Sequence, residues 1–292
     1  MTRTKLIALA LFCIPALSLY AAGDKPAYRL FDREGNPVTY SEMLSASAEQ
    51  EVILFGELHN NPIAHWLQFE LSRDLHAMFD SSLVLGAEMF EVDDQIILDE
   101  YLGGQILERH FTAEAKLWNN YETDYRPLVL MARENGLRFI ATNIPRRYAA
   151  MVHRSGFGAL EDLDGQGRSY MAPLPIPYDP ELPGYRAMLD MEGLPAHAGE
   201  NFPKAQAIKD ATMAHFILQH MVPGGLFVHF NGAYHSNNDE GIGWYLREYS
   251  ADDLVILTIS TVEQDNPSEL LEEHLGLADY IIVVPSSMTK TY

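Results

Sequence analysis

The sequence predicts an α/β fold, with a mostly parallel central sheet covered by helices on both faces. Two observations lead to this prediction. Short, continuous apolar runs of strand length recur along the chain, and amphipathic helical patterns separate them. Continuous apolar runs are typical of strands buried on both faces, as in parallel sheets. The length of 292 residues and the hydrophobic content of 47% are sufficient for one large domain.

The predicted strands follow a short N-terminal segment, Tyr28 to Phe31, and a polar turn around Gly35. Each later apolar run ends in a glycine or in polar residues, and a helical pattern usually precedes the next run. The predicted strands are residues 52–55, 83–85, 137–141, 226–230, 254–259 and 280–284.

Capping residues mark the predicted helices. Asn61 followed by Pro62 predicts a helix start, because asparagine accepts hydrogen bonds from free backbone N–H groups and proline fits the first turn. A second helix is predicted over residues 127–135, where Gly136 can supply a left-handed terminal residue. A long apolar-faced helix is predicted over residues 204–222.

Residues 156–203 interrupt this alternation, with seven prolines and no clear hydrophobic period. A long irregular segment inside a compact domain is usually functional or disordered, and the tyrosine and methionine content argues against disorder. We expect an irregular or helical insertion that lies as a lid over the C-terminal strand edge. The alternative is a surface segment packed on itself. Residues 23–292 are expected to form a single domain.

The first 22 residues are expected to be a signal peptide. Arg3 and Lys5 precede a mostly apolar run at 6–19 that is short for a membrane span, and small residues at 21–23 suit cleavage. An uncleaved anchor is the alternative. The protein is therefore expected to be exported, to the periplasm or cell surface.

Composition narrows the classes of function. The net charge of −21 disfavours nucleic acid and anionic membranes as partners, because like charges repel. Cys13 is the only cysteine in the sequence. Cleavage of the signal peptide would therefore exclude disulfides, thiol catalysis and cysteine metal sites.

Polar side chains follow several predicted strands at the point where each ends. Glu57 and His59 follow the first strand, and their i, i+2 spacing points them to the same side of an extended chain. Glu88, Asn143 and His235 follow the next three strands in sequence order. Because ligands bind at the carboxyl ends of strands in open α/β sheets, these residues are expected to line one site.

The chemistry of this site has several interpretations. Carboxylates and imidazoles can bind a divalent metal ion, with Glu57, His59, Glu88 and His235 as the expected ligands. The same four residues can instead be catalytic without metal, with a histidine as general base oriented by a carboxylate. Each can also be a structural polar residue. No His-Glu-x-x-His zinc motif and no glycine-rich phosphate loop occurs in the sequence.

Two other histidines are expected to be peripheral. His65, in the first helix, is expected to face solvent or to support the site from behind. His229 lies inside a predicted strand, where packing is the expected role.

Several sequence blocks, taken in order, resemble the ChaN-like haem-binding uptake family of the Tiki superfamily. The first is Gly-Glu-Leu-His-Asn-Asn-Pro at residues 56–62, and the resemblance extends over roughly residues 50–250. One departure is Tyr234, which precedes His235 where the family usually has glycine. The remaining blocks are residues 86–90, 98–102, 125–128, 141–146 and 231–235.

The resemblance implies a parallel α/β fold and a role in iron or haem acquisition, together with outer-membrane haem uptake components. It also implies haem held between two subunits by a tyrosine ligand, since a phenolate suits ferric iron. The candidate tyrosines are Tyr170, Tyr178 and Tyr185, which are expected to be exposed in the irregular segment. Arg146 is a candidate partner for haem propionates, and a solvated charge at a helix start is the alternative.

Three functions follow from these observations. The first is an exported haem-binding protein that holds haem at a homodimer interface. The second is a metal-dependent hydrolase of small esters or peptides, because distant superfamily members are metal-dependent proteases or metal-free esterases that use the Glu/His edge. The third is a non-catalytic binding module.

Overall fold

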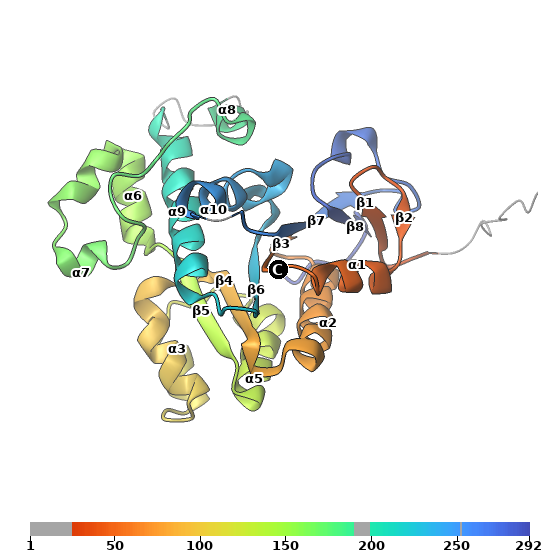
Figure 1. The fold of residues 1–292 in the computed structure, drawn as a ribbon, viewed down its shortest axis with the longest axis horizontal. Helices are drawn as coiled ribbons and strands as arrows, with labels where there is room; N and C mark the ends of the chain where they lie inside the picture. Colours follow the sequence, from red (N-terminus) through yellow and green to blue (C-terminus); the bar gives the residue numbers. More distant parts are fainter. Residues whose placement is uncertain (1–24, 190–198, 252) are drawn as a thin grey trace, which may run out of the picture.

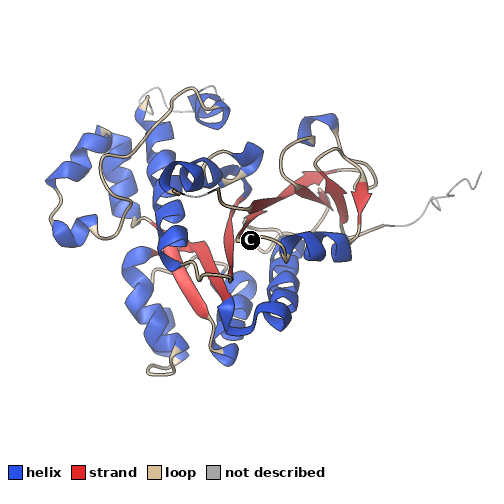
Figure 2. Ribbon diagram, in the orientation of Figure 1, coloured by secondary structure: helices blue, strands red, loops and turns tan. Residues whose placement is uncertain are grey.

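The fold is built on one eight-stranded sheet (Figures 1 and 2). The computed structural model describes residues 25–189, 199–251 and 253–292, so the predicted signal peptide lies outside the described residues. The strand order is β2-β1-β8-β7-β3-β6-β4-β5. The strands are β1 (Arg29–Asp32), β2 (Pro37–Val38), β3 (Val52–Glu57), β4 (Leu83–Glu91), β5 (Arg138–Asn143), β6 (Leu226–Gly232), β7 (Ile256–Gln264) and β8 (Tyr280–Pro285).

The six strands from β8 to β5 are parallel, which confirms the predicted fold class and the six predicted strands. β1 is antiparallel to both of its neighbours, β2 and β8. The sequence did not predict β1 and β2 as strands. They contain four and two residues, too few for an apolar period to be recognised.

Helices cover both faces of the sheet. Figure 1 shows α2, α3 and α5 on one side and α6, α9 and α10 on the other, and each group packs on its own apolar core. The helices are α1 (Tyr40–Ser47), α2 (Pro62–Phe79), α3 (Gln95–Leu102), α4 (Glu108–Glu114), α5 (Arg126–Asn135), α6 (Arg146–Ser155), α7 (Gly165–Arg168), α8 (Pro183–Leu189), α9 (Asn201–His220) and α10 (Ile242–Tyr249). None of the helices in the described part of the chain has the length and apolarity that a membrane crossing requires.

Strand β3 shows why its apolar run is continuous. All of its residues are buried: Ile53 and Phe55 belong to the core beneath α2 and α5, whereas Val52 and Leu54 belong to the core beneath α9 and α10. Successive side chains of a strand point to opposite faces, so a strand covered on both faces has no polar positions. Glu57, its last residue, is the first polar group of the strand.

The turn from β3 into α2 is set by the predicted capping residues. The Asn61 side chain accepts hydrogen bonds from the N–H groups of Ile63 and Ala64 at 3.0 and 3.2 Å, and Pro62 occupies the first turn. The helix therefore starts five residues after Glu57, which leaves His59 in the short turn. Gly136 also ends α5 in the left-handed conformation, with φ +66°, as predicted.

The insertion at 156–203 contains α7 and α8, and residues 190–198 lie outside the described part. Its contacts tie it to the segment that follows β6. The backbone N–H of Gly184 donates to Glu240 at 2.6 Å, and its carbonyl accepts from the hydroxyl of Tyr234 at 2.5 Å. These bonds hold the start of α8 beside the C-terminal edge of the strands.

Candidate functional site

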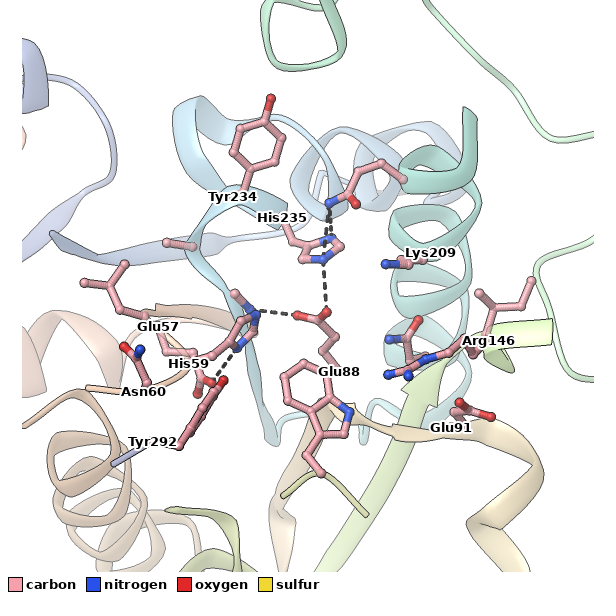
Figure 3. Close-up of a pocket in the computed structure, with 17 residues that line it drawn as sticks. Glu57, His59, Asn60, Glu88, Glu91, Arg146, Lys209, Tyr234, His235 and Tyr292 are labelled. Atoms are coloured by element: carbon pink, nitrogen blue, oxygen red, sulfur yellow. Dashed lines mark hydrogen bonds and ion pairs between the residues drawn. The ribbon is translucent and has the colours of Figure 1, made fainter. Parts of the chain in front are cut away.

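A pocket of about 700 Å³ opens at the carboxyl edge of the parallel strands (Figure 3). The ends of β3, β4, β5 and β6 line it, and α9 supplies part of its wall. The structure brings all five strand-end residues singled out in the sequence to this pocket: Glu57, His59, Glu88, Asn143 and His235.

The first polar pair in the pocket is Glu57 with His59. The buried Glu57 carboxylate accepts from His59 Nδ1 at 2.9 Å, from Gln68 Nε2 at 2.6 Å and from the hydroxyl of Tyr125 at 2.7 Å. Burial alone would raise the pKa of Glu57, but the charge of His65 and the bonds to His59 and Tyr125 hold it below the ordinary value. Glu57 is therefore an anion that fixes one nitrogen of His59.

His59 is the accessible member of this pair. Its side chain is 34% exposed, and burial is outweighed by the bond to Glu57, which raises the pKa of the imidazole. Nε2 lies beside Gly232, where a Cβ atom would stand 2.7 Å from it. A glycine is required at position 232 for the ring to occupy this place.

The second cluster joins β4, α9 and the turn that follows β6. His235 contacts Glu88 Oε1 through Nε2 at 3.1 Å and Asp210 Oδ1 through Nδ1 at 2.5 Å. Glu88 also accepts from the backbone N–H of Gly232 at 2.8 Å, and Asp210 accepts from the hydroxyl of Tyr185 at 2.8 Å. All three ionisable side chains are buried. A single imidazolium therefore lies between two carboxylates.

Electrostatics make this cluster charged. Burial opposes the imidazolium of His235, but the carboxylates of Glu88 and Asp210 outweigh it and raise its pKa to about 9. Burial likewise opposes the Glu88 anion, yet His235 lowers the pKa of Glu88 well below the ordinary value. For Asp210 burial dominates and its pKa is raised. The charge of the cluster thus rests chiefly on the His235–Glu88 ion pair.

Buried polar side chains of α2 contact Glu57 and His59 on the side away from the pocket. His65 contacts Gln68 Oε1 at 3.2 Å through Nδ1 and the carbonyl of His59 at 3.1 Å through Nε2. Its expected exposure to solvent is wrong, and its expected supporting position is correct. His229 packs inside β6 between Thr142 and Asn231, and burial lowers its pKa to about 4.

The four predicted metal ligands are engaged with each other. Glu57 contacts His59, and Glu88 contacts His235, whose other nitrogen contacts Asp210. In the described ranges, no group of three or more His, Cys, Asp or Glu side chains is arranged to hold a metal ion. As placed, the four residues do not fit a shared metal centre.

The sequence model of the family described as haem-binding uptake, Tiki superfamily, ChaN, matches residues 43–246. The chain belongs to this ChaN family. The match confirms the resemblance that the strand-end motifs indicated. No curated protein matches the sequence.

Solved structures share the ChaN fold at low sequence identity. ChaN of Campylobacter jejuni, solved with cofacial haem binding, has a TM-score of 0.65 and 16% identity, over 88% of this chain and 96% of that protein. A mutant of the erythromycin esterase EreC in its open conformation has a TM-score of 0.50 and 12% identity, over 91% of this chain and 98% of that protein. At these identities the likeness concerns the fold alone.

The tyrosines that reach the pocket of this ChaN protein differ from those expected. Tyr170, Tyr178 and Tyr185 do not line it, whereas Tyr234 and Tyr292 do. The expected exposure of Tyr185 is wrong, because its ring is buried and its hydroxyl is bonded to Asp210. Burial raises the pKa of Tyr185 well above the ordinary value.

Residues near the end of the chain bring Tyr292 to the site. The backbone N–H of Thr291 donates to the carbonyl of Asn60 at 3.0 Å, and its hydroxyl donates to Asp124 at 2.8 Å. In Figure 1 the C mark lies beside β3, and in Figure 3 Tyr292 lies beside His59.

Helix α9 supplies three site residues that the sequence analysis missed: Gln206, Lys209 and Asp210. One signal was available. Asp210 is a carboxylate among buried apolar positions such as Ile208 and Ala211. A buried carboxylate needs a partner, so its position indicated a polar contact across the helix interface.

Proposed function

We propose that this protein binds haem in the pocket at the strand ends and takes part in iron or haem acquisition. The observation that carries the proposal is the family match over residues 43–246. The pocket supports it, because Tyr234 and Tyr292 are 47% and 64% exposed there and Trp118 adds a third aromatic surface. Aromatic faces suit a flat macrocycle, and a phenolate is an established ligand of ferric iron.

A haem titration with tyrosine variants tests this proposal. Ferric haem is expected to give a saturable Soret shift at micromolar concentration, and Tyr234→Phe or Tyr292→Phe is expected to weaken binding at least about tenfold by removing an iron ligand. Tyr170→Phe and Tyr178→Phe are the matched controls outside the pocket. An absent Soret shift contradicts haem binding, and a loss confined to the two controls contradicts this location.

We propose further that the haem lies at a homodimer interface and that the protein is exported. The ChaN structure of Campylobacter jejuni with cofacial haem supports the first statement, and the basic and apolar residues at 1–22 support the second. Light scattering should show a dimer that forms on haem addition. N-terminal sequencing of protein recovered from the periplasm or cell surface should begin near residue 23, whereas an intact N-terminus contradicts cleavage.

A second candidate function is hydrolysis of a small ester or peptide. The observation that favours it is the Glu57–His59 pair, with His59 reaching the pocket and its Nδ1 held by a carboxylate. In this role His59 would take the proton of an attacking water at Nε2, while Glu57 orients the ring. This scheme assigns each step to His59, Glu57 and water.

The hydrolase candidate is tested with ester and peptide substrates, with and without added Mn²⁺, Co²⁺ or Zn²⁺. His59→Gln is expected to lower turnover about 100-fold or more, the usual contribution of a general base. Turnover that is absent under all conditions, or unchanged in His59→Gln, contradicts the candidate.

A further inference from the structure

Residues 290–292, which we call the strap, run along one side of the pocket. After β8 the chain crosses β7 towards β3 at the carboxyl edge of the sheet, and the backbone N–H of Ser286 donates to the carbonyl of Gln264 at 3.0 Å. The strap then reaches the turn between β3 and α2, where Tyr292 lines the pocket beside His59 (Figure 3). None of the strap residues is buried, so the strap is not part of the apolar core.

Thr291 anchors the strap twice. Its backbone N–H donates to the carbonyl of Asn60 at 3.0 Å, and its hydroxyl donates to the buried carboxylate of Asp124 at 2.8 Å. The same carboxylate accepts from Asn120 Nδ2 at 2.7 Å, and this nitrogen also donates to the carbonyl of His59 at 2.9 Å. Asp124 therefore links the strap to the backbone of the turn that carries His59.

Lys290 supplies a third anchor, which is ionic. It forms an ion pair with Glu263 of β7, and both side chains are partly exposed. The Glu263 carboxylate also accepts from the side-chain amide of Asn61 at 3.2 Å, so this pair reaches the same turn where it enters α2. Partly exposed ion pairs and single hydrogen bonds are individually weak. The strap can therefore detach while the sheet stays folded, because local opening breaks only contacts of this kind.

The strap also separates two cavities. A second cavity of about 580 Å³, with Asn119 and Arg147 among its lining residues, adjoins the pocket. Trp118 and Tyr292 line both cavities, so the two spaces meet at these rings. The ring of Trp118 lies edge-on to that of His59, with centroids 4.9 Å apart, whereas Tyr292 is 64% exposed and is placed by the strap. Tyr292 is thus the member of this boundary that strap movement would remove.

We propose that the strap is a gate. While Thr291 and Lys290 hold it, Tyr292 covers the His59 side of the pocket and separates it from the second cavity. Release of the strap exposes His59 and joins the two spaces into one groove that admits a larger ligand, as in loops that control access to a site. The inference goes beyond the proposed haem function, because the gate acts on access to the pocket whichever ligand binds there.

Chemical modification of His59 tests the gate without any ligand. Diethyl pyrocarbonate modifies accessible imidazoles, and mass spectrometry of peptides gives the rate at each histidine. The variant Lys290→Gln/Thr291→Val removes both side-chain anchors and keeps Tyr292. Its His59 is expected to react at least about fivefold faster than in the wild type, because the loss of two weak contacts raises the open population by this order. The rate at the exposed His110 should not change, which shows that the variant remains folded.

Thr289→Val is the matched control, because it makes the same chemical change just outside the strap. It is expected to leave the rate at His59 at the wild-type value. Deletion of residues 290–292 is expected to give at least the increase of the double variant. An unchanged rate at His59 in the double variant and in the deletion overturns the gate.

Ferric haem then serves as a large probe of access, followed by stopped-flow absorbance. The association rate constant is expected to rise at least about threefold in Lys290→Gln/Thr291→Val and to stay at the wild-type value in Thr289→Val. An unchanged association rate in a variant whose His59 has become more reactive overturns control of ligand entry by the strap. If the wild type binds no haem, the haem function fails, whereas the reactivity of His59 still decides whether the strap is a gate.

Discussion

Replacing His235 with alanine is expected to lower the free energy of unfolding by about 3–5 kcal/mol at neutral pH. The side chain is buried between Glu88 at 3.1 Å and Asp210 at 2.5 Å. Its removal leaves two buried carboxylates that share no cation, and the cost of an uncompensated buried charge is large. Chemical denaturation followed by circular dichroism measures the change.

Two comparisons separate this electrostatic cost from the cost of replacing any histidine with alanine. His110→Ala removes an exposed imidazole and is expected to change stability by no more than about 0.5 kcal/mol. Adding Asp210→Asn to His235→Ala is expected to recover part of the loss, because the amide oxygen can still accept from Tyr185 without a negative charge. Equal stability of His235→Ala and His110→Ala would show that the cluster is not charged.

The wild-type protein is expected to lose about 3 kcal/mol of stability as the pH rises through 9, from the titration of His235 alone. The carboxylates raise the pKa of His235 from the ordinary 6.5 to about 9 in the folded state, against the opposing effect of burial. A raised folded-state pKa means that the folded protein retains a proton which the unfolded chain releases. The stabilisation is therefore complete below pH 6.5 and disappears as the pH passes 9.

Unfolding curves measured from pH 6 to pH 9.5 check this dependence. His235→Gln has no proton to lose at this position, so its stability is expected to vary less over the same range. NMR titration of His235 should independently give a midpoint well above 6.5. Parallel pH profiles for the wild type and His235→Gln would refute the assignment of the charge to this residue.

Much of the fold could be predicted from the sequence because local pattern and tertiary burial agree. Strand β3 is covered on both faces, and its apolar run made it recognisable. The caps at Asn61 and Gly136 act through backbone bonds within a few residues, so their sequence signals are local. The two-residue strand β2 depends on pairing with β1, which no local pattern records.

The site was predictable in part for the same reason. Glu57 and His59 could be identified as site residues from their i, i+2 spacing at a strand end. Asp210 reaches His235 from a helix packed across the sheet, and this contact depends on the tertiary fold. Tyr185 was expected to be exposed in the proline-rich segment, yet its hydroxyl donates to the same buried Asp210. The positions of Asp210 and Tyr185 in the site thus depend on contacts between elements that are distant in sequence.

A structure of the haem complex will show whether haem binds in the pocket formed by the strand ends. We expect the macrocycle to lie in this pocket beside Tyr234 and Tyr292. Haem bound instead at Tyr170 or Tyr178, with the pocket empty, would contradict it.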